Sequence, residues 1–183
     1  VRSPAADQRA PGIEYVVADV RSMELTDLCR RCAVDCVVHL AAIVTPGRAS
    51  NRQLEYEIDV LGTQNVLEAC RAAGVHTLIY TSSGAAYGYH ADNPEWLDES
   101  HALRGNAEFA YADHKRLVEE MLACWRVTHP ELRQLIFRAG TILGARARNQ
   151  LTALFDRFGV LGLSGAQSPF VIIWDQDVVG AIL

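Results

Sequence analysis

The sequence has no long apolar stretch, because no hydrophobic run approaches the roughly 20 residues that a membrane-spanning helix needs. It also lacks an excess of positive charge. The net charge of −5 at pH 7 gives no electrostatic reason to expect a nucleic acid or an anionic membrane as partner. Residues 1–4 do not form the apolar core of a secretory signal. These features favour a cytoplasmic protein that binds neither nucleic acid nor membrane.

Cysteine is scarce and odd in number, with five residues in the chain, which favours free thiols over disulfides in the absence of a secretory signal. Cys29, Cys32 and Cys36, followed by His39, superficially resemble the spacing of a zinc site. However, Cys29 and Cys32 lie in a helical pattern, whereas Cys36 to His39 lie in a strand pattern. Free cysteine is commonly a small buried hydrophobe, so the sequence predicts no metal site.

The length and composition fit one domain with a buried core, since 183 residues are 50% hydrophobic and 21% charged. Apolar runs typical of strands alternate with helical patterns along the chain. This alternation predicts an α/β fold with a doubly wound parallel sheet. Strands are expected at residues 13–18, 36–42, 77–83, 132–137 and 170–174, and helices at 22–32, 53–73, from 111 to just before Pro130, and around 151–158.

Local signals mark several of these boundaries. Ser22 is a candidate N-cap for the first helix, and Gly74 suits the left-handed residue that ends the helix at 53–73. Pro130 cannot continue the helix that precedes it. The segment 36–42 is almost continuously apolar, as expected of a parallel strand buried on both faces.

The stretch from Thr77 to Lys115 is the best candidate for a functional site. An apolar strand ends at Ser83, and after a loop a helix opens with Tyr111 and reaches Lys115 four residues later. That spacing places Tyr111 and Lys115 on one helix face. A hydroxyl, a phenol and an ammonium can therefore meet at the carboxyl end of a strand, where open α/β sheets bind ligands. The alternative is an exposed pair on an ordinary helix, with Ser83 capping a turn.

Five groups of residues occur in an order that resembles a known family. Together they resemble the extended short-chain dehydrogenase/reductases, specifically the NAD-dependent epimerase/dehydratase group, over essentially the whole chain. The resemblance implies a Rossmann-like sheet, NAD or NADP as cofactor and a small-molecule substrate. The groups are Asp19-Val20, His39-Leu40-Ala41-Ala42, Val60-Leu61-Gly62-Thr63, Ser82-Ser83 before Tyr87-Gly88, and Tyr111 with Lys115.

One feature of that family is missing upstream of these motifs. No GxxGxxG or GxGxxG loop occurs there, although the family uses one to bind the cofactor diphosphate. The resemblance implies a chain that lacks the first βαβ unit, so the 13–18 strand would have no neighbour. We expect a single dinucleotide-binding-type domain over residues 1–183, incomplete at both ends, in which the substrate-binding portion starts within about 141–183.

The resemblance assigns three catalytic residues: Tyr111 as acid/base, Lys115 as its electrostatic partner and Ser83 as the ligand of the substrate oxygen. The ordinary pKa of tyrosine, near ~10, is too high for an efficient base at neutral pH, and a neighbouring ammonium lowers it. The same comparison implies that Lys115 binds the nicotinamide ribose. Ser82 is expected to be structural, because Ser83 has the family's spacing to Tyr87.

The resemblance also implies cofactor contacts. Asp19 is expected to reach the adenine amino group, with Val20 beside the ring, and residues 40–42 to line the diphosphate and ribose. Arg2 is a candidate for the 2′-phosphate of NADP. The alternatives are a turn-forming Asp19, a plain strand end and a solvent-exposed Arg2. The implied cofactor-binding residues are Asp19, Val20, Leu40, Ala41, Ala42, Tyr111, Lys115 and Arg2.

Three further residues carry specific expectations. Asp59 stands where the group often has asparagine, and an ionised carboxylate only accepts hydrogen bonds, which puts an amide's relay role in doubt. His114 is expected to point away from Tyr111 and Lys115, as a surface residue. Gly62 lies in mid-helix, where glycine costs about 1 kcal/mol relative to alanine, so close packing against the strand layer or the cofactor is expected.

The function implied by the resemblance is an NAD(P)-dependent oxidoreductase or epimerase that acts on a sugar-like, possibly nucleotide-sugar, hydroxyl. Arg146 and Arg148 are candidates to meet a nucleotide diphosphate, with a solvated basic loop as the alternative. Because the glycine loop is missing, a non-catalytic dinucleotide-fold binding module or an inactive truncated remnant is the competing class. A serine hydrolase is disfavoured, since no GxSxG elbow surrounds the serines. The helices at 53–73 and 110–128 are expected to pair in a homodimer.

Overall fold

The computed structural model describes residues 9–47, 51–145, 147, 152–155, 159, 165 and 171–183. Strands and helices alternate along the described chain, as predicted. No helix in these described ranges is long and apolar enough to cross a membrane. In chain order the elements are α1 (Glu24–Arg31), β1 (Cys36–His39), α2 (Arg52–Tyr56), the π-helical turn η2 (Glu57–Leu61), α3 (Gly62–Ala73), β2 (Thr77–Ser83), the 3-10 turn η3 (Gly84–Tyr87), α4 (Ala110–Thr128), β3 (Arg133–Ala139), β4 (Thr141–Leu143), α5 (Thr152–Phe155), β5 (Ile172–Trp174) and α6 (Asp175–Ile182).

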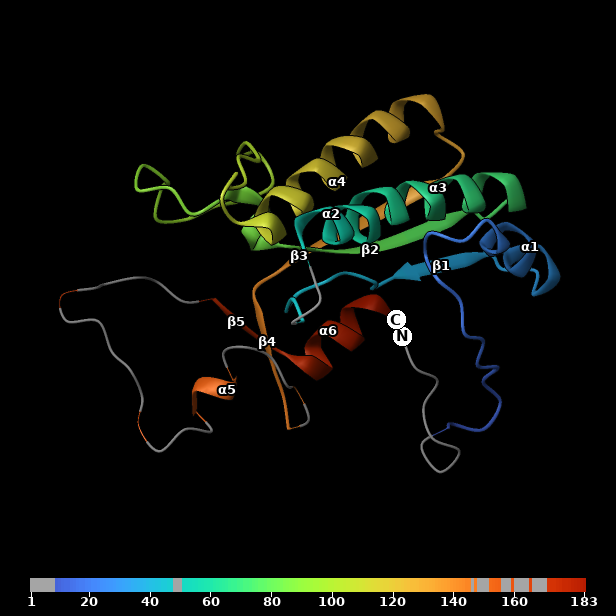
Figure 1. Ribbon diagram of the computed structural model, residues 1–183, viewed down its shortest axis with the longest axis horizontal. Helices are drawn as coiled ribbons and strands as arrows, with labels where there is room; N and C mark the ends of the chain where they lie inside the picture. The colour runs from blue at the N-terminus through green and yellow to red at the C-terminus, as the bar shows by residue number, and fades with distance from the viewer. Residues whose placement is uncertain are drawn as a thin grey trace.

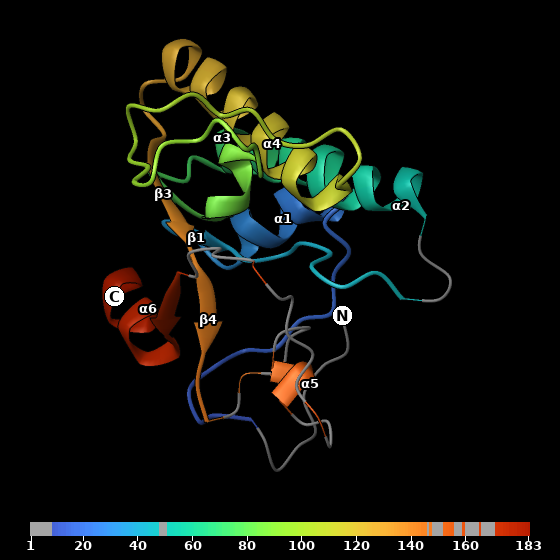
Figure 2. The same cartoon turned by 90° about the vertical axis from the view of Figure 1, so that its left-hand side faces the viewer.

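The central sheet has three parallel strands in the order β1-β2-β3. Its register places Val38 opposite Ile79, and Ile79 opposite Leu135. A second parallel pair, β4 and β5, lies at the end of β3, with α6 beside it (Figure 2). The expected parallel α/β class of the Rossmann type is confirmed, with an incomplete sheet.

The core lies between this sheet and one layer of helices. The continuous rod α2-η2-α3 and helix α4 run side by side over one face of the sheet (Figure 1). Leu67 of α3, Leu78 of β2, and Val118 and Leu122 of α4 are completely buried in this layer. Burial of each such side chain contributes roughly 1.5–3 kcal/mol, so the packing holds α4 firmly on β2.

The prediction that residues 36–42 are a strand buried on both faces is wrong in two respects. The strand ends at His39, and the side chain of Val38 is 41% exposed. Leu135, on the same face of the sheet, is 47% exposed. The helices α2 to α4 cover only the opposite face, which explains why β1 alternates between buried and exposed side chains.

The prediction of a strand at residues 13–18 is also wrong, because these residues form no strand in the structure. Ile13, Val16 and Val17 are 58%, 46% and 66% exposed. A strand requires a neighbour that satisfies its backbone groups. Among the described strands β1 pairs only with β2, so apolar composition alone does not make 13–18 a strand.

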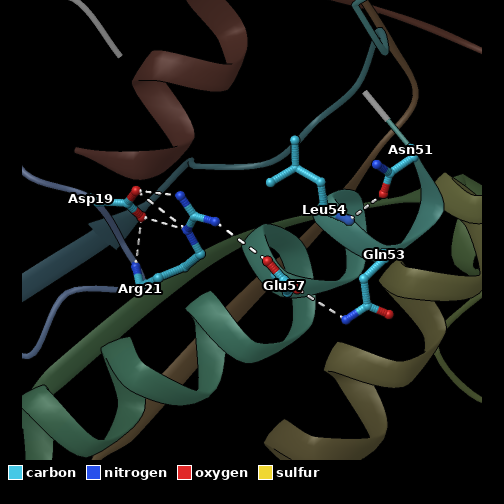
Figure 3. Close-up of polar contacts among 6 residues, drawn as sticks. All are labelled: Asp19, Arg21, Asn51, Gln53, Leu54 and Glu57. Carbon is cyan, nitrogen blue, oxygen red and sulfur yellow. Dashed lines mark hydrogen bonds and ion pairs between the residues drawn. The ribbon is translucent and has the colours of Figure 1, made fainter. Parts of the chain in front are cut away.

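The long helix predicted at 53–73 is confirmed, although η2 interrupts it with a π-helical turn. The side chain of Asn51 caps its start by accepting a hydrogen bond from the Leu54 amide (Figure 3). Gly74 ends it with a left-handed φ of 73°, as predicted. Gly62 is packed closely, since a Cβ atom there would lie 2.7 Å from Cγ2 of Val20. The absence of a side chain at Gly62 therefore lets residues 19–20 approach the helix.

Other boundaries agree less closely. Ser22 accepts a hydrogen bond from the Glu24 amide, but Met23 occupies the capping position of α1. Helix α4 ends at Thr128, before Pro130 as predicted. The predicted helix at 151–158 is described only over α5, and Arg2, Arg146 and Arg148 lie outside the described residues.

Three elements were not predicted: the 3-10 turn η3, the strand β4 and the helix α6. Only Gly140 separates the three residues of β4 from the end of β3, so the sequence offers no separate apolar run for β4. The start of α6 carries a signal that could have been used. Its first turn contains Asp175 and Asp177, and carboxylates favour the positive end of the helix dipole.

Candidate active site

Lys115 is anchored at the carboxyl end of β2. It lies on the first turns of α4, with only 5% of its surface exposed. Its ammonium donates hydrogen bonds to the hydroxyl of Tyr80, at 3.0 Å, and to the carbonyl oxygen of Thr81, at 2.7 Å. The Nζ atom also lies 4.6 Å from the centre of the Tyr80 ring and 5.7 Å from the centre of the Tyr111 ring. The alternative of a solvent-exposed Tyr111–Lys115 pair is therefore excluded.

Ser83 is the last residue of β2 and the N-cap of η3. Its hydroxyl accepts a hydrogen bond from the Ala85 amide at 3.1 Å, which is the capping role considered from the sequence. The same hydroxyl lies beside the Tyr111 phenol and lowers its pKa. The structure thus brings Ser83, Tyr111 and Lys115 together at one strand end, and the capping contact leaves Ser83 in position to meet Tyr111.

The pKa of the Tyr111 phenol is raised, because burial disfavours the phenolate more than Ser83 favours it. This differs from the expected lowering by Lys115, whose ammonium is directed at Tyr80 and Thr81 instead. Burial lowers the pKa of Lys115 itself to about 8, while the carboxylates of Asp59 and Glu119 oppose that shift. Both side chains are therefore held in an environment that penalises their charged forms.

The expectation that His114 is a surface residue is wrong. Its side chain is 2% exposed, and Nδ1 lies 3.0 Å from Oδ2 of Asp59, which is 6% exposed. Asp59 also accepts a hydrogen bond from the Ile43 amide through Oδ1, at 2.8 Å. The sequence contains a signal for this position, because His114 lies four and eight residues before the buried Val118 and Leu122 and so on the same helical stripe.

His39 forms a second buried contact near Lys115. Its Nε2 lies 2.9 Å from the hydroxyl of Thr63, which donates a hydrogen bond to the carbonyl oxygen of Asp59 at 2.6 Å. Since that hydroxyl hydrogen is used on Asp59, Nε2 of His39 must donate. Burial, reinforced by the nearby positive charge of Lys115, lowers the pKa of His39 to about 4. His39 is therefore neutral at pH 7 and serves as a hydrogen-bond donor.

Glu119 of α4 and Arg138 of β3 form an ion pair in which Glu119 is buried and Arg138 is partly buried. The Arg138 guanidinium donates three hydrogen bonds of 2.8–3.1 Å to the Glu119 carboxylate, and a fourth of 2.7 Å to the Tyr87 hydroxyl. Ser82 is buried and donates its hydroxyl hydrogen to Glu119. This contact accounts for Ser82 as a structural residue that ties the end of β2 to α4.

The residues predicted to contact a cofactor occupy two places. Leu40, Ala41 and Ala42 follow β1, and β1 lies beside β2 with His39 opposite Tyr80. The carboxyl ends of the two strands therefore meet on one edge of the sheet, with Leu40 62% exposed.

Asp19 and Val20, the other predicted cofactor contacts, lie against the α2-η2-α3 rod. The Asp19 carboxylate accepts hydrogen bonds from the Arg21 guanidinium, at 2.7 Å, and from the Arg21 amide, at 2.9 Å (Figure 3). These bonds lower the pKa of Asp19 to about 2. Arg21 reaches on to Glu57, and the Val20 carbonyl accepts a bond from Asn65 at 2.7 Å. The turn-forming alternative for Asp19 is thus present, and Arg21 and Asn65 are residues that the sequence analysis missed.

Within the described part of the chain, no three His, Cys, Asp or Glu side chains are grouped so that they could hold a metal ion. The cysteines there are free thiols. The candidate site therefore consists of a hydroxyl, a phenol and an ammonium at the end of a strand, next to a segment of small residues at the end of the neighbouring strand.

This geometry defines the chain as an α/β protein of the Rossmann class with a Ser, Tyr and Lys constellation at the carboxyl edge of its sheet. Comparison with known proteins specifies the family. The sequence model of the "NAD dependent epimerase/dehydratase family" matches residues 2–165. The chain belongs to this family.

Individual relatives agree with this assignment. The chain is 32% identical over 134 residues to a UDP-glucose 4-epimerase of Yersinia pestis, covering 72% of this chain and 39% of that protein. It is 36% identical over 142 residues to an N-acetyl-alpha-D-glucosaminyl-diphospho-ditrans,octacis-undecaprenol 4-epimerase of Escherichia coli O157:H7, covering 77% of this chain and 41% of the relative. The matches thus span less than half the length of these two relatives.

Solved structures show the same fold. The crystal structure of a Thermus thermophilus UDP-glucose 4-epimerase in complex with NAD aligns with a TM-score of 0.68 and 26% identity. The alignment covers 79% of this chain and 46% of that chain. The described elements therefore have the fold of the corresponding part of that protein.

Proposed function

We propose that the protein containing this chain is an NAD-dependent epimerase that acts on a hydroxyl of a nucleotide-sugar substrate, with Ser83, Tyr111 and Lys115 at its catalytic centre. The observation that carries the proposal is the convergence of these three side chains at the carboxyl end of β2. Membership of the family and the names of two relatives, both 4-epimerases, support the reaction and the substrate class.

Tyr111 is the acid/base in this proposal. When the substrate hydroxyl is oxidised, its proton passes to the Tyr111 phenolate as hydride leaves the carbon, and the return step gives the proton back. NAD, when bound, supplies the hydride acceptor. Burial opposes formation of the phenolate. The Ser83 hydroxyl favours the phenolate. The Lys115 ammonium is directed at Tyr80 and Thr81 but lies 5.7 Å from the Tyr111 ring centre, where its positive charge would add to that effect.

The residues present fit a dinucleotide at the edge formed by β1 and β2. Leu40, Ala41 and Ala42 offer small or exposed side chains beside the backbone at the end of β1. Lys115 presents an ammonium at the end of β2 and would hold the ribose next to the reacting carbon. Asp19 would share its carboxylate between Arg21 and the adenine amino group, which the several lone pairs of a carboxylate allow.

Calorimetry and turnover test the proposal on the full-length protein that contains this chain. NAD and NADP are titrated separately, and UDP-glucose is then incubated with the cofactor-loaded protein while its epimer is followed by NMR. We expect binding of NAD in preference to NADP, and interconversion of the two sugars. Failure to bind either cofactor would remove the proposal.

A non-catalytic dinucleotide-fold module is the second candidate. It is favoured by the raised pKa of Tyr111 and by the direction of the Lys115 ammonium, which contacts Tyr80 and Thr81. The two candidates differ in one result. A protein of the second kind binds NAD but leaves nucleotide sugars unchanged at every pH at which it is folded.

We also propose a homodimer in which the α2-η2-α3 rod and α4 of two copies form a four-helix bundle. The support is that the two helices lie side by side on one surface of the protein (Figure 1). Light scattering during gel filtration would give twice the mass of one copy. A single-copy mass at micromolar concentration would contradict the dimer.

The division of the chain also stays a prediction. We propose that residues 1–183 are one dinucleotide-binding-type domain whose substrate-binding portion starts within about 141–183. The separate β4-β5 pair, with α6 against it, supports such a start near Thr141. The cytoplasmic location likewise stays a prediction from the sequence.

A further inference from the structure

A buried carboxylate and imidazole connect the two parts of the candidate site. Asp59 lies in the π-helical turn η2, and His114 lies on α4 next to Lys115. Oδ1 of Asp59 accepts a hydrogen bond from the amide of Ile43, which directly follows residues 40–42. Oδ2 of Asp59 is hydrogen-bonded to Nδ1 of His114. Turns of π-helix inside α-helices are frequent at functional sites. Asp59 therefore bridges the segment after β1 and the helix that carries Tyr111 and Lys115.

The geometry around the imidazole indicates how it bonds. An ionised carboxylate has no hydrogen to give, so Nδ1 of His114 must be the donor. The edge of the His114 ring meets the ring of Tyr56, with centres 5.7 Å apart and planes at 74°. His114 is thus held by two residues of the α2-η2-α3 rod, Asp59 and Tyr56.

Lys115 is surrounded by groups from every neighbouring element. Two of them are buried carboxylates, Asp59 and Glu119. Glu119 is matched by the Arg138 guanidinium through three hydrogen bonds. Asp59 has no Arg or Lys side chain within ion-pair distance among the described residues. The titratable groups near Lys115 are His39 of β1, Tyr80 of β2, Asp59 of η2, and Tyr111 and Glu119 of α4. His114 adjoins Lys115 in sequence, and its side chain is directed at Asp59.

We propose that Asp59 and His114 are positioning residues for Lys115 and Tyr111: the pair fixes α4 against the segment after β1 and keeps a net negative charge behind the Lys115 ammonium. The meaning of this charge rests on the proposed function, since an ammonium that stays protonated at neutral pH can favour the Tyr111 phenolate. Asp59 raises the pKa of Lys115 and of His39, and it also raises that of Tyr111, so its favourable effect on the phenolate is exerted only through the protonated Lys115.

The ionisation of Lys115 tests this proposal without any catalytic assay, so its outcome is separate from that of the proposed function. Lys115 is the only lysine in the 183 residues. Its ε-carbon NMR resonance is assigned in the full-length protein as the one absent from Lys115→Arg, and is titrated with pH. In Asp59→Asn the amide still accepts from Ile43 and can donate to His114. We expect the pKa of Lys115 to fall by roughly one pH unit in that variant.

Two variants serve as controls. Asp113→Asn removes a carboxylate that lies on the same helix as Lys115 but pairs with Arg52 and Arg116. We expect an unchanged pKa for Lys115 in this variant. His114→Asn keeps a neutral donor near the position of Nδ1, and we also expect an unchanged pKa. Thermal unfolding confirms that each variant is folded. If Asp59→Asn does not fold, the double variant Asp59→Asn with His114→Asn replaces it, and the same fall is expected.

Two results would overturn the proposal. An unchanged Lys115 pKa in folded Asp59→Asn shows that the carboxylate does not act on the ammonium. A rise of the Lys115 pKa in His114→Asn shows that the imidazole had been neutralising Asp59, so the pair carries no net charge.

Discussion

The Nζ atom of Lys115 lies 2.7 Å from the carbonyl oxygen of Thr81. An ammonium on α4 therefore binds backbone at the end of β2, in a place from which water is almost excluded. Charge at such a place is costly unless it is hydrogen-bonded, and Tyr80 supplies a second partner at 3.0 Å. The site thus keeps a charged group in a setting that disfavours its charge.

Lys115→Met is expected to remove a dependence of stability on pH. The pKa of Lys115 is about 8 in the folded protein and 10.5 in its ordinary environment. Between these values the unfolded chain binds more protons, so the contribution of Lys115 to the free energy of unfolding rises with pH and is lost again as pH falls through 8. The free energy of unfolding of the wild type, minus that of Lys115→Met, should rise by roughly 2–3 kcal/mol between pH 7 and 10.5.

Urea unfolding of both proteins at several pH values measures this difference. Subtraction removes the titrations of tyrosines and cysteines, which the two proteins share. Parallel stability curves for wild type and Lys115→Met would show that the ammonium is not penalised by burial.

Tyr111→Phe is expected to lower turnover by about 10²- to 10⁴-fold with a much smaller effect on NAD affinity, because the acid/base hydroxyl is lost while the other proposed cofactor contacts remain. Since burial raises the pKa of the phenol, we expect the wild-type rate of hydroxyl oxidation to increase toward alkaline pH. Kinetics of the full-length protein over a pH series measure both effects. Tyr15→Phe, on the segment before α1, is the matched control with unchanged turnover. Wild-type rates in Tyr111→Phe would exclude the phenol from the reaction.

Gly62→Ala is expected to destabilise the protein, although alanine is the better helix former by about 1 kcal/mol. The added Cβ would lie 2.7 Å from Cγ2 of Val20, a stiff β-branched side chain. Relief of such a clash costs about 1–3 kcal/mol, so the net change is a loss. Thermal unfolding measures it, and Val20→Ala combined with Gly62→Ala should recover most of the stability. A stabilised single variant would contradict the close packing.

Glu119→Gln is expected to lower the free energy of unfolding by about 2–3 kcal/mol, because it leaves the Arg138 charge without its carboxylate. Glu119 is almost completely buried and Arg138 is 19% exposed, which moderates the penalty. Denaturant unfolding measures the loss. Arg138→Met with Glu119→Leu, which removes both charges, should be less destabilised than Glu119→Gln. Equal losses in the two variants would show that the uncompensated charge is not the cause.

Local sequence signals were sufficient for several elements. The apolar strand at 77–83, the end of α4 before Pro130 and the stop of α3 at Gly74 were predicted correctly. Each of these depends on the residues themselves, through side-chain periodicity, the missing amide of proline or the freedom of glycine. The spacing that puts Tyr111 and Lys115 on one helix face belongs to the same class.

Two predictions that depended on distant neighbours failed. Residues 13–18 have strand-like composition but form no strand, because pairing is a property of two segments. His114 was expected at the surface because its side chain is polar, yet it is buried and hydrogen-bonded to Asp59, which is 55 positions earlier.

The sequence by itself determined the alternation of strands and helices, the family and the order of its motifs, because these are encoded in neighbouring residues and their spacing. Only the tertiary structure decided which face of β1 is covered, where the Lys115 ammonium is directed and that burial raises the pKa of Tyr111. The reason is physical: burial and electrostatic environment are sums over groups that come together only when the chain folds.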